Sequence, residues 1–441
     1  MMKIIVAKFG GSSLADSNKF KMVKEIIKAN EDRRFIVASA PGKISSTDSK
    51  ITDLLYLCYD LANSKINYAE ILELINNKYK EIVSNIGIDF DIDAHLKELD
   101  EQLQSGKSRD YIASRGEYLN AKILAVFLGF EFIDAKDLIF FDSKGNFLEE
   151  KSYEEIHKLR ESGKKYVIPG FYGRDSRGEI KTFTRGGGDL TGSIISAGLK
   201  SDLYENWTDV SGFMTCDPKI VKNPKHIDVI TYRELRELSY AGASILHEEA
   251  ILPVSKAGIP VVIKNTFKPD DKGTMILPDG TEHLENSLKG VTGIAGRKNF
   301  TVINIEKTKM NKDKGFHRKL MSVLEVNNVI IEHMPSSIDS VSLIIADKYL
   351  TGGMDSLISE IKTFLRPDKI KITKGIALIS VVGRGMINHI GVSANLFNAL
   401  AEEKINIQMI IQGSSEMNII VGIDEKDFEN AIRSIYQAFL N

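Results

Sequence analysis

The chain has 441 residues, which is too long for one hydrophobic core and predicts two or three domains. Its 58 Lys and Arg side chains nearly balance its 60 Asp and Glu side chains, so the charge gives no support for binding to nucleic acid or to an anionic membrane. No apolar stretch approaches the roughly 20 residues of a membrane span, and the run before Lys8 is too short for a signal peptide. We therefore expect a cytoplasmic protein.

The cysteines and histidines predict neither a disulfide nor a metal centre. Cys58 and Cys216 are the only cysteines, and they lie far apart without metal-site spacing, which is typical of reduced structural thiols. The eight histidines are scattered without pairing. We expect no metal site made of protein side chains.

The N-terminal segment has the pattern of a phosphate-binding turn. The apolar run Ile4–Val6 predicts a buried parallel strand, Lys8 stands near its end, and Gly10, Gly11 and Ser12 follow. Glycines let backbone N–H groups approach an anion, and the periodicity over 16–29 predicts a helix N-terminus nearby. The alternative is an ordinary strand-to-helix turn whose lysine extends to solvent.

Further segments continue this alternation of strands and helices. Residues 35–43 repeat the opening pattern, residues 51–104 have helical periodicity, and residues 166–173 form a strand that breaks into a glycine-rich turn. Between them, residues 114–117 (Ser-Arg-Gly-Glu) lie near the start of another predicted helix. The pattern predicts an α/β domain with ligand-binding loops at its strand ends.

A second glycine-rich segment places three consecutive glycines between Arg185 and Asp189, ahead of a helix-like run. Such glycines let backbone donors crowd a phosphate or a carboxylate, Arg185 can hold a carboxylate, and Asp189 can orient a nearby lysine. A flexible surface loop is the alternative. The polar, turn-rich segment 207–219 is a candidate nucleotide pocket. Residues 260–267 have the pattern of the last buried strand, and we place the end of this domain between about 270 and 292.

The C-terminal part contains an internal repeat. The glycine and apolar positions from Gly315 onward recur without a gap from Gly391 onward, 76 residues later. Each copy predicts an amphipathic helix that begins at a glycine, then a strand, a polar turn and another strand. The repeat predicts two small α+β modules, and a duplication with only a structural role is the alternative.

The chain resembles the aspartate kinases of the amino-acid kinase family. Lys-Phe-Gly-Gly-Ser-Ser, Ser-Ala-x-Gly-Lys, Ser-x-Gly-Glu, Gly-Phe-Tyr-Gly, Arg-Gly-Gly-x-Asp and Trp-Thr-Asp-Val occur in family order, and the repeat resembles paired ACT domains. The resemblance implies an α/β fold with a mainly parallel sheet sandwiched by helices, followed by two ferredoxin-like α+β ACT modules. It implies a catalytic domain over 1–280, a linker and a strand of the second ACT module over 281–306, the first module over 307–374 and the second over 375–441.

The implied reaction transfers the γ-phosphate of ATP, bound with Mg²⁺, to the β-carboxylate of L-aspartate. The product would be 4-phospho-L-aspartate, the first step towards lysine, threonine and methionine. Because a free side-chain carboxyl has a pKa near ~3.9, the nucleophile is already ionised at pH 7 and needs no general base.

The resemblance also implies a role for each motif residue. Lys8, Arg185 and Asp189 would be catalytic, with Lys8 and the two glycines after it on the transferred phosphate and Asp189 organising Lys8. Arg185 would hold the α-carboxylate of aspartate and Glu117 would lie near its ammonium. The residues framing aspartate would be Ser39, Thr47, Glu117, Phe171 and Arg185. Those binding ATP would be Lys8, Gly10, Gly11, Ser12, Thr208, Asp209, Met214, Asp217 and Lys219.

The sequence departs from the family in two places. Gly188 stands where the glycine loop usually has serine, and Thr184 stands where it usually has glycine. Further on, Ser244, Glu248 and Glu249 replace the family's lysine, proline and arginine. Because that lysine normally faces the nucleotide, its loss should weaken ATP binding.

The ACT resemblance implies feedback regulation. In the first module the effector would contact Met310, Asp313, Gly315, Phe316, Ser336, Ser337 and Asp339. These hydroxyl, backbone and carboxylate groups suit an α-amino acid with a second ammonium, so lysine is the expected inhibitor and threonine the next candidate. Sheet edges in such modules usually pair between chains, so we expect a homodimer or a homotetramer.

Two other functions remain open on the sequence. A related kinase acting on glutamate, a carbamate or a nucleotide would keep the opening turn, but would not ordinarily combine Ser-Arg-Gly-Glu with two regulatory modules. A catalytically weak or inactive amino-acid sensor is supported by Ser244 and its acidic neighbours. The retained charges of Lys8, Arg185, Asp189 and Asp209 argue against the sensor.

Overall fold

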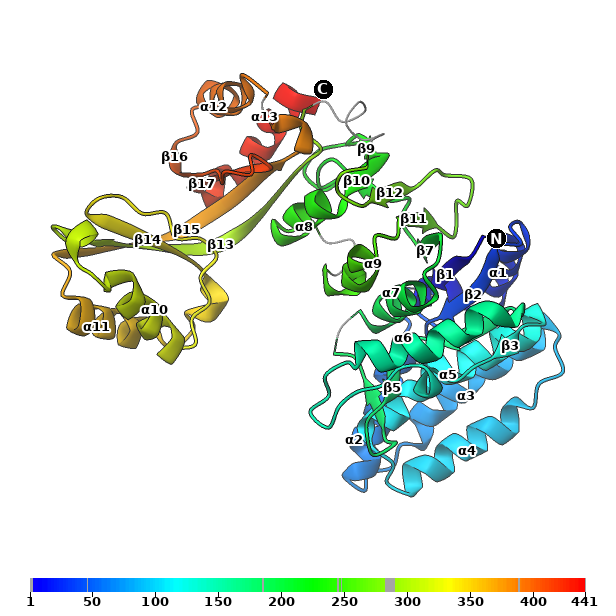
Figure 1. Cartoon of the computed structure of the whole chain (residues 1–441). Coiled ribbons are helices and arrows are strands. Elements are labelled where there is room, and N and C mark those ends of the chain that lie inside the picture. Colours follow the sequence, from blue (N-terminus) through cyan, green and yellow to red (C-terminus); the bar gives the residue numbers. More distant parts are fainter. Residues whose placement is uncertain are drawn as a thin grey trace. The chain divides into compact units, whose positions relative to one another are not determined.

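The computed structural model describes residues 3–45, 47–184, 186–243, 246, 248–281, 290–387 and 389–440. It contains two compact units (Figure 1). The first comprises Met1–Phe213, His226–Leu235 and Ser244–Thr281, and the second comprises Met214–Lys225, Arg236–Ala243 and Glu282–Asn441. Two segments inside the expected catalytic range 1–280 therefore cluster with the second unit.

In its described part the first unit is built on an eight-stranded sheet with the strand order β10-β12-β11-β7-β1-β2-β4-β3. Neighbouring strands are parallel except β11 and β12. The central strand β1 is buried along its whole length, as expected for a strand covered on both faces. The strands are β1 (Ile5–Phe9), β2 (Arg33–Ala38), β3 (Glu131–Phe132), β4 (Tyr166–Pro169), β7 (Leu203–Thr208), β10 (Val229–Thr231), β11 (Val261–Asn265) and β12 (Thr274–Leu277).

Strand β12 corrects one expectation. The sequence predicted that β11 would be the last strand of this sheet, but β12 follows it and pairs with it antiparallel. The chain reverses at Gly273, whose φ of +73° favours glycine. Four residues with alternating burial are too short a signal to read from hydrophobicity alone.

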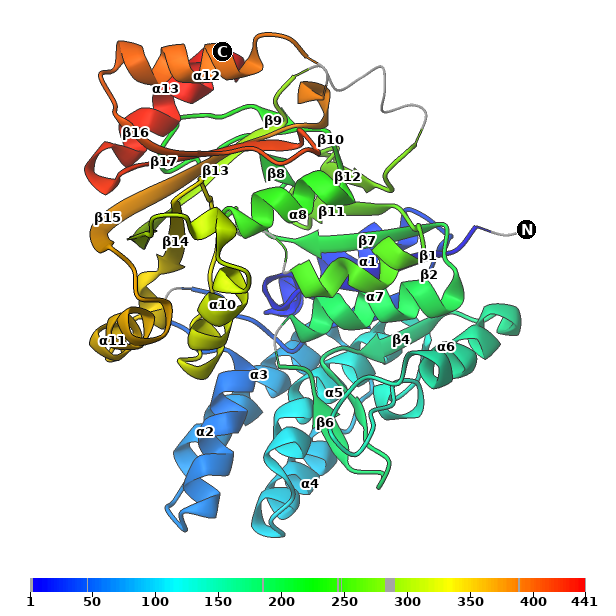
Figure 2. The ribbon, with the colours of Figure 1, turned by 60° about the vertical axis from the view of Figure 1, so that its left-hand side comes forward.

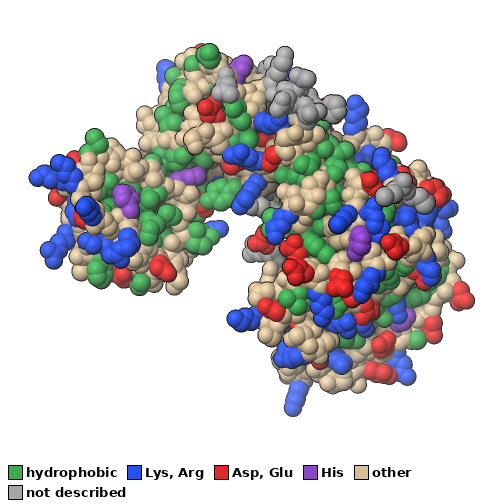
Figure 3. Space-filling model, in the orientation of Figure 1, with side chains coloured by type: hydrophobic (Ala, Val, Ile, Leu, Met, Phe, Trp, Pro, Cys, Tyr) green, Lys and Arg blue, Asp and Glu red, His purple; other side chains and the backbone are tan. Residues whose placement is uncertain are grey.

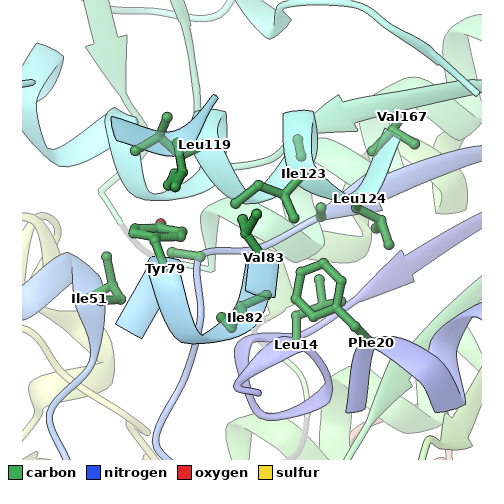
Figure 4. Close-up of a cluster of buried hydrophobic side chains, with 14 of the residues drawn as sticks. Leu14, Phe20, Ile51, Tyr79, Ile82, Val83, Leu119, Ile123, Leu124 and Val167 are labelled. Atoms are coloured by element: carbon green, nitrogen blue, oxygen red, sulfur yellow. The ribbon is translucent and has the colours of Figure 1, made fainter. Parts of the chain in front are cut away.

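Helices on one face of the sheet share a hydrophobic core with it. They are α1 (Ser17–Lys28), α2 (Ile51–Asn63), α3 (Ala69–Ile86), α4 (Ile92–Gln104) and α5 (Arg109–Leu128), as the periodicity predicted. In Figure 4, Leu14 and Phe20 lie close to Ile82 of α3 and to Leu124 of α5. Cys58 is buried in this core as a free thiol.

The other face carries α6 (Glu149–Lys158), α7 (Gly187–Leu199) and α9 (Leu252–Lys256). Helix α7 contacts β1, β7, α6 and α9 (Figure 2). Successive side chains of a strand point to opposite faces. Phe9 of β1 therefore lies in the core with α1 to α5, whereas Lys8 points to α7. The helices thus sandwich the sheet.

The second unit has a five-stranded antiparallel sheet with the order β14-β13-β15-β17-β16. Two long strands, β13 (Gly293–Glu306) and β15 (Lys369–Val382), run side by side through both modules (Figure 1). The other strands are β14 (Ser340–Ala346), β16 (Ile407–Ile411) and β17 (Asn418–Asp424), and the helices are α10 (Phe316–Val326), α11 (Met354–Leu365), α12 (Val392–Glu402) and α13 (Phe428–Leu440).

Strand β13 is divided between the two modules. Ile294 lies in the core of the second module, as expected for a strand placed before the first module. Ile303 and Ile305, however, lie in the core of the first module, and this half of β13 pairs with β14. Residues 300–306 therefore differ from the expected assignment of 281–306 to the linker and the second module.

The repeat is visible in the backbone. Gly315 and Gly391 precede α10 and α12 with φ values of +96° and +98°. The strand expected after α10 is reduced to isolated bridges at His333 and Ser336, whereas the second copy forms β16. Pro335 between the bridges has no N–H to donate to a ladder, which explains the difference.

Smaller elements complete the described chain. They include a 3-10 helix over Gly11–Leu14, the hairpin β5 (Tyr172–Arg174) and β6 (Ile180–Thr182), β8 (Phe213–Met214), β9 (His226–Ile227) and α8 (Tyr232–Tyr240). Among the described residues, the helices are too short or too polar to span a bilayer. In the view of Figure 3, acidic and basic side chains are interspersed over the first unit.

Candidate active site

Lys8 and Asp189 form an ion pair at the carboxyl end of the central strand. Lys8 is 6 % exposed near the end of β1, and the first turn of α7 brings Asp189 to it, with 2.5 Å between Nζ and Oδ1. The Asn206 amide donates to the same Oδ1 over 2.9 Å. Since Lys8 and Asn206 are paired in register on β1 and β7, the sheet fixes these two groups, and the first turn of α7 fixes Asp189. A shielded cation held this way can neutralise a phosphate.

The turn after β1 approaches a second turn backbone to backbone. Gly42 N–H donates to Gly11 O over 2.8 Å, and a Cβ at Gly42 would lie 2.5 Å from the Gly11 carbonyl carbon. Gly10 N–H donates to Trp207 O over 3.0 Å, and a Cβ at Gly10 would lie 3.3 Å from Lys8 Nζ. The glycines therefore bring bare backbone beside the Lys8 ammonium.

Each glycine of the triple run meets a different structural requirement. Gly186 has a φ of +59°, a conformation that favours glycine. A Cβ at Gly187 would lie 2.5 Å from the Phe171 ring, and one at Gly188 would lie 2.7 Å from Ser39 Oγ. The run is thus the start of α7 packed against two predicted substrate residues. Arg185 lies outside the described residues.

Glu117 is a buried carboxylate on α5 that faces the loop after β2. It is 7 % exposed, and its Oε2 has no hydrogen-bond partner within the described structure. Burial raises the pKa of Glu117 to about 8, although the Ala40 N–H and the Arg115 charge act in the opposite direction. An incompletely paired buried carboxylate of this kind suits a ligand cation.

The other predicted aspartate residues lie on loops at the ends of β2 and β4. Ser39 follows β2, and its carbonyl accepts from Asn120 of α5 over 2.6 Å. Phe171 follows β4 with a φ of +80°, which is strained for a phenylalanine, and its N–H donates to Thr191 Oγ1 over 3.0 Å. Thr47 is exposed.

The predicted nucleotide residues are divided between the two units. Ser12 lies in the 3-10 helix after β1, and Thr208 and Asp209 lie at the end of β7, all in the first unit. Met214, Asp217 and Lys219 belong to the second unit, where each is exposed. The residues that depart from the family give little geometry: Ser244 and the Glu248 side chain lie outside the described residues, and Glu249 is exposed.

The sequence interpretation missed two residues that hold Asp189. Asn206 was not among the predicted site residues, although it shares a register with Lys8. Tyr204 donates its hydroxyl to Asp189 O over 3.0 Å and packs against Gly192, where a Cβ would lie 2.5 Å from Oη. Both residues could have been found from the alternation of side chains along β7, because positions 204 and 206 share the face of the sheet that α7 covers.

Among the predicted effector residues, Met310, Asp313, Gly315 and Phe316 lie at or just before the start of α10, whereas Ser336, Ser337 and Asp339 precede β14. Met310 and Phe316 are buried, whereas Gly315, Ser336, Ser337 and Asp339 are exposed. Lys307 Nζ lies 2.5 Å from Asp313 Oδ2, and Lys309 N–H donates to Asp339 Oδ1 over 2.8 Å. Both carboxylates therefore already have donors within the chain.

Comparisons with known proteins agree with this geometry. Residues 3–265 match the amino acid kinase family and residues 379–439 match an ACT domain. Aspartokinase 3 of Bacillus subtilis is 37 % identical, with 98 % of each chain covered. The crystal structure of Clostridium acetobutylicum aspartate kinase is 55 % identical with a TM-score of 0.91, covering 99 % of this chain and 100 % of that one. Escherichia coli aspartokinase III, solved with aspartate and ADP and with lysine and aspartate, is 24 % identical with TM-scores of 0.75 and 0.73; each match covers 99 % of this chain, and 99 % and 100 % of the other.

Proposed function

Because this chain belongs to the amino acid kinase family, among its aspartokinases, we propose that it transfers the γ-phosphate of ATP to the β-carboxylate of L-aspartate. The observation that carries the proposal is the Lys8–Asp189–Asn206 cluster beside the two glycine turns. A shielded ammonium next to bare backbone suits a phosphoryl group on which negative charge spreads.

The reaction requires that the negative charge of the two reactants is neutralised and that the reactants are aligned. The attacking carboxylate of aspartate is ionised at neutral pH, so the protein has only to bring two anions together in line. Lys8 would contact the transferred phosphoryl group, while Asp189 and Asn206 would fix its ammonium. We propose that Mg²⁺ arrives as part of the nucleotide substrate and offsets further phosphate charge.

Aspartate would bind between α5 and the glycine run at the start of α7. Glu117 supplies the counter-charge for the substrate ammonium, since its Oε2 has no partner within the described structure. Ser39, Thr47 and Phe171 would frame the rest of the amino acid. For Arg185 on the α-carboxylate the support is the family motif alone.

The proposed ATP residues are Gly10, Gly11, Ser12, Thr208 and Asp209 in the first unit, with Met214, Asp217 and Lys219 from the second. Their support is the order of the motifs along the chain and the position of the first five after β1 and β7, where ligands bind in α/β sheets. The replacement of the family's lysine by Ser244 predicts weak ATP binding.

For regulation we propose that L-lysine binds the first module at the start of α10, with L-threonine as the next candidate. Asp313 and Asp339 are the acceptors for its ammonium groups, and a bound lysine would compete with Lys307 for Asp313. Binding there would favour a less active packing of the modules. We also propose a homodimer or a homotetramer through the edges of the regulatory sheet.

The test is hydroxamate trapping of the acyl phosphate with ATP, Mg²⁺ and L-aspartate, with and without L-lysine. We expect aspartate-dependent product that Lys8→Ala abolishes and that the control Lys21→Ala, at an exposed position of α1, retains. Absence of product at saturating ATP would contradict the kinase and favour an amino-acid sensor. Product with glutamate in place of aspartate would contradict the substrate.

A further inference from the structure

The loop between β2 and α2 carries a proposed substrate residue without regular secondary structure to hold it. It begins at Ser39, crosses to α2 at Ile51, and exposes Thr47 at its tip. Gly42 is tied to Gly11 by a backbone hydrogen bond, and Ile51 N–H donates to Pro41 O over 3.4 Å. The described residues 43–45 and 47–49 therefore need another anchor if Thr47 is to keep one position.

A lysine from α3 provides this anchor. Lys78 Nζ donates to Gly42 O over 2.7 Å and to Asp48 Oδ2 over 2.8 Å. The Asp48 carboxylate also accepts from the backbone N–H groups of Ile44 and Ser49, each over 2.8 Å. One ammonium thus closes a network that begins at Gly42 and ends at Ser49, on both sides of Thr47.

The Lys78–Asp48 network is partly shielded from solvent. The Lys78 side chain is 11 % exposed and that of Asp48 is 28 % exposed, so the pair is less screened than a surface ion pair. Burial alone would raise the pKa of Asp48, but the hydrogen bonds from Lys78, Ile44 and Ser49 outweigh it and lower that pKa below its usual value. The carboxylate is therefore stabilised in its charged form.

The next residue of α3 supports the opposite side of the same site. Tyr79 is fully buried and donates its hydroxyl to Gly116 O over 2.8 Å, directly before Glu117. One turn of α3 thus holds both the Thr47 loop and the segment of α5 that carries the proposed ammonium ligand. This places Lys78 where it acts on substrate geometry without touching substrate.

We propose that Lys78 is a positioning residue that fixes the 42–49 loop for aspartate binding, an inference that rests on the proposed function. Lys78→Met should raise the KM for aspartate roughly tenfold and change kcat less than twofold, because Gly42 keeps its own backbone bond to Gly11 of the phosphate turn while the Asp48 side of the loop loses its anchor. Lys78→Arg keeps a cation with several donors and should recover most of the affinity.

The matched control is Lys80→Met on the same helix. Lys80 pairs with Asp93 at 2.6 Å, but both side chains are exposed, at 49 % and 74 %, and this ion pair involves no residue of the loop. The KM of Lys80→Met for aspartate should stay at the wild-type value. In an Asp48→Asn background, Lys78→Met should raise the KM for aspartate by less than a further twofold, because the two residues act through one network.

Hydrogen exchange of the 42–49 amides gives a readout that does not depend on activity. Lys78→Met should speed exchange in this loop, and Lys80→Met should not. A folded Lys78→Met protein with unchanged KM and unchanged exchange would overturn the inference, as would an equal effect of Lys80→Met. If the wild type forms no acyl phosphate, the proposed function fails, and the exchange data still decide whether Lys78 holds the loop.

Discussion

Replacing Glu117 by glutamine should stabilise the ligand-free protein while weakening aspartate binding. Burial raises the pKa of Glu117 from 4.5 to about 8. Between these values the unfolded chain releases the proton and the folded chain keeps it, so this group lowers stability progressively as the pH rises. The free energy of unfolding that is lost through this group is about 3 kcal/mol at pH 7 and reaches about 5 kcal/mol above pH 8. Glutamine is isosteric and does not titrate, so Glu117→Gln should recover much of the lost free energy of unfolding.

The assay is urea unfolding of the wild type and of Glu117→Gln at pH 5, 7 and 8.5. We expect nearly equal stability at pH 5 and a gap that widens in favour of the variant towards pH 8.5. Saturating aspartate should narrow the gap, because its ammonium pairs with the Glu117 carboxylate in the wild type alone. For the same reason the KM for aspartate of the wild type should fall as the pH rises towards about 8.

Glu101→Gln serves as the control, since this side chain on α4 is 64 % exposed and forms an ion pair with the exposed Lys97. It should leave the pH profile of stability unchanged. Parallel profiles for the wild type and Glu117→Gln would refute the reasoning. Unchanged aspartate affinity in Glu117→Gln would refute its role as the ammonium ligand.

Further predictions concern the phosphate site, the glycine run and the modules. Asp189→Asn removes the counter-charge of the catalytic lysine and should lower kcat about 100-fold in the hydroxamate assay, with the fold retained by circular dichroism. Gly187→Ala places a Cβ 2.5 Å from the Phe171 ring and 2.9 Å from its Cα, and thermal unfolding should show a loss of about 1–3 kcal/mol. Gly315→Ala and Gly391→Ala should each cost about 1 kcal/mol in urea unfolding because both glycines have positive φ. Only Gly315→Ala should change inhibition by lysine, and an equal change in both would contradict an effector site in the first module.

The sequence by itself determined most of the elements and their order. The buried strand before Lys8, the helix over 16–29 and the helices over 51–104 followed from apolar periodicity, which is a local property. The two modules followed from a repeat that kept its glycines in register. The buried free thiol of Cys216 also agrees with expectation, and burial raises its pKa to about 11.

The tertiary structure decided which of these residues meet. The bond of Asn206 to Asp189 depends on the register of β1 beside β7, strands whose sequences lie about 200 residues apart. Strand β12 and the divided strand β13 depend on long-range pairing that short apolar runs do not encode. The contact of Lys78 with the Thr47 loop depends on how α3 packs beside α2, since a lysine on an amphipathic helix ordinarily faces solvent. Local sequence fixes backbone conformation, whereas these partners are chosen only when the whole sheet and its helices close around a common core.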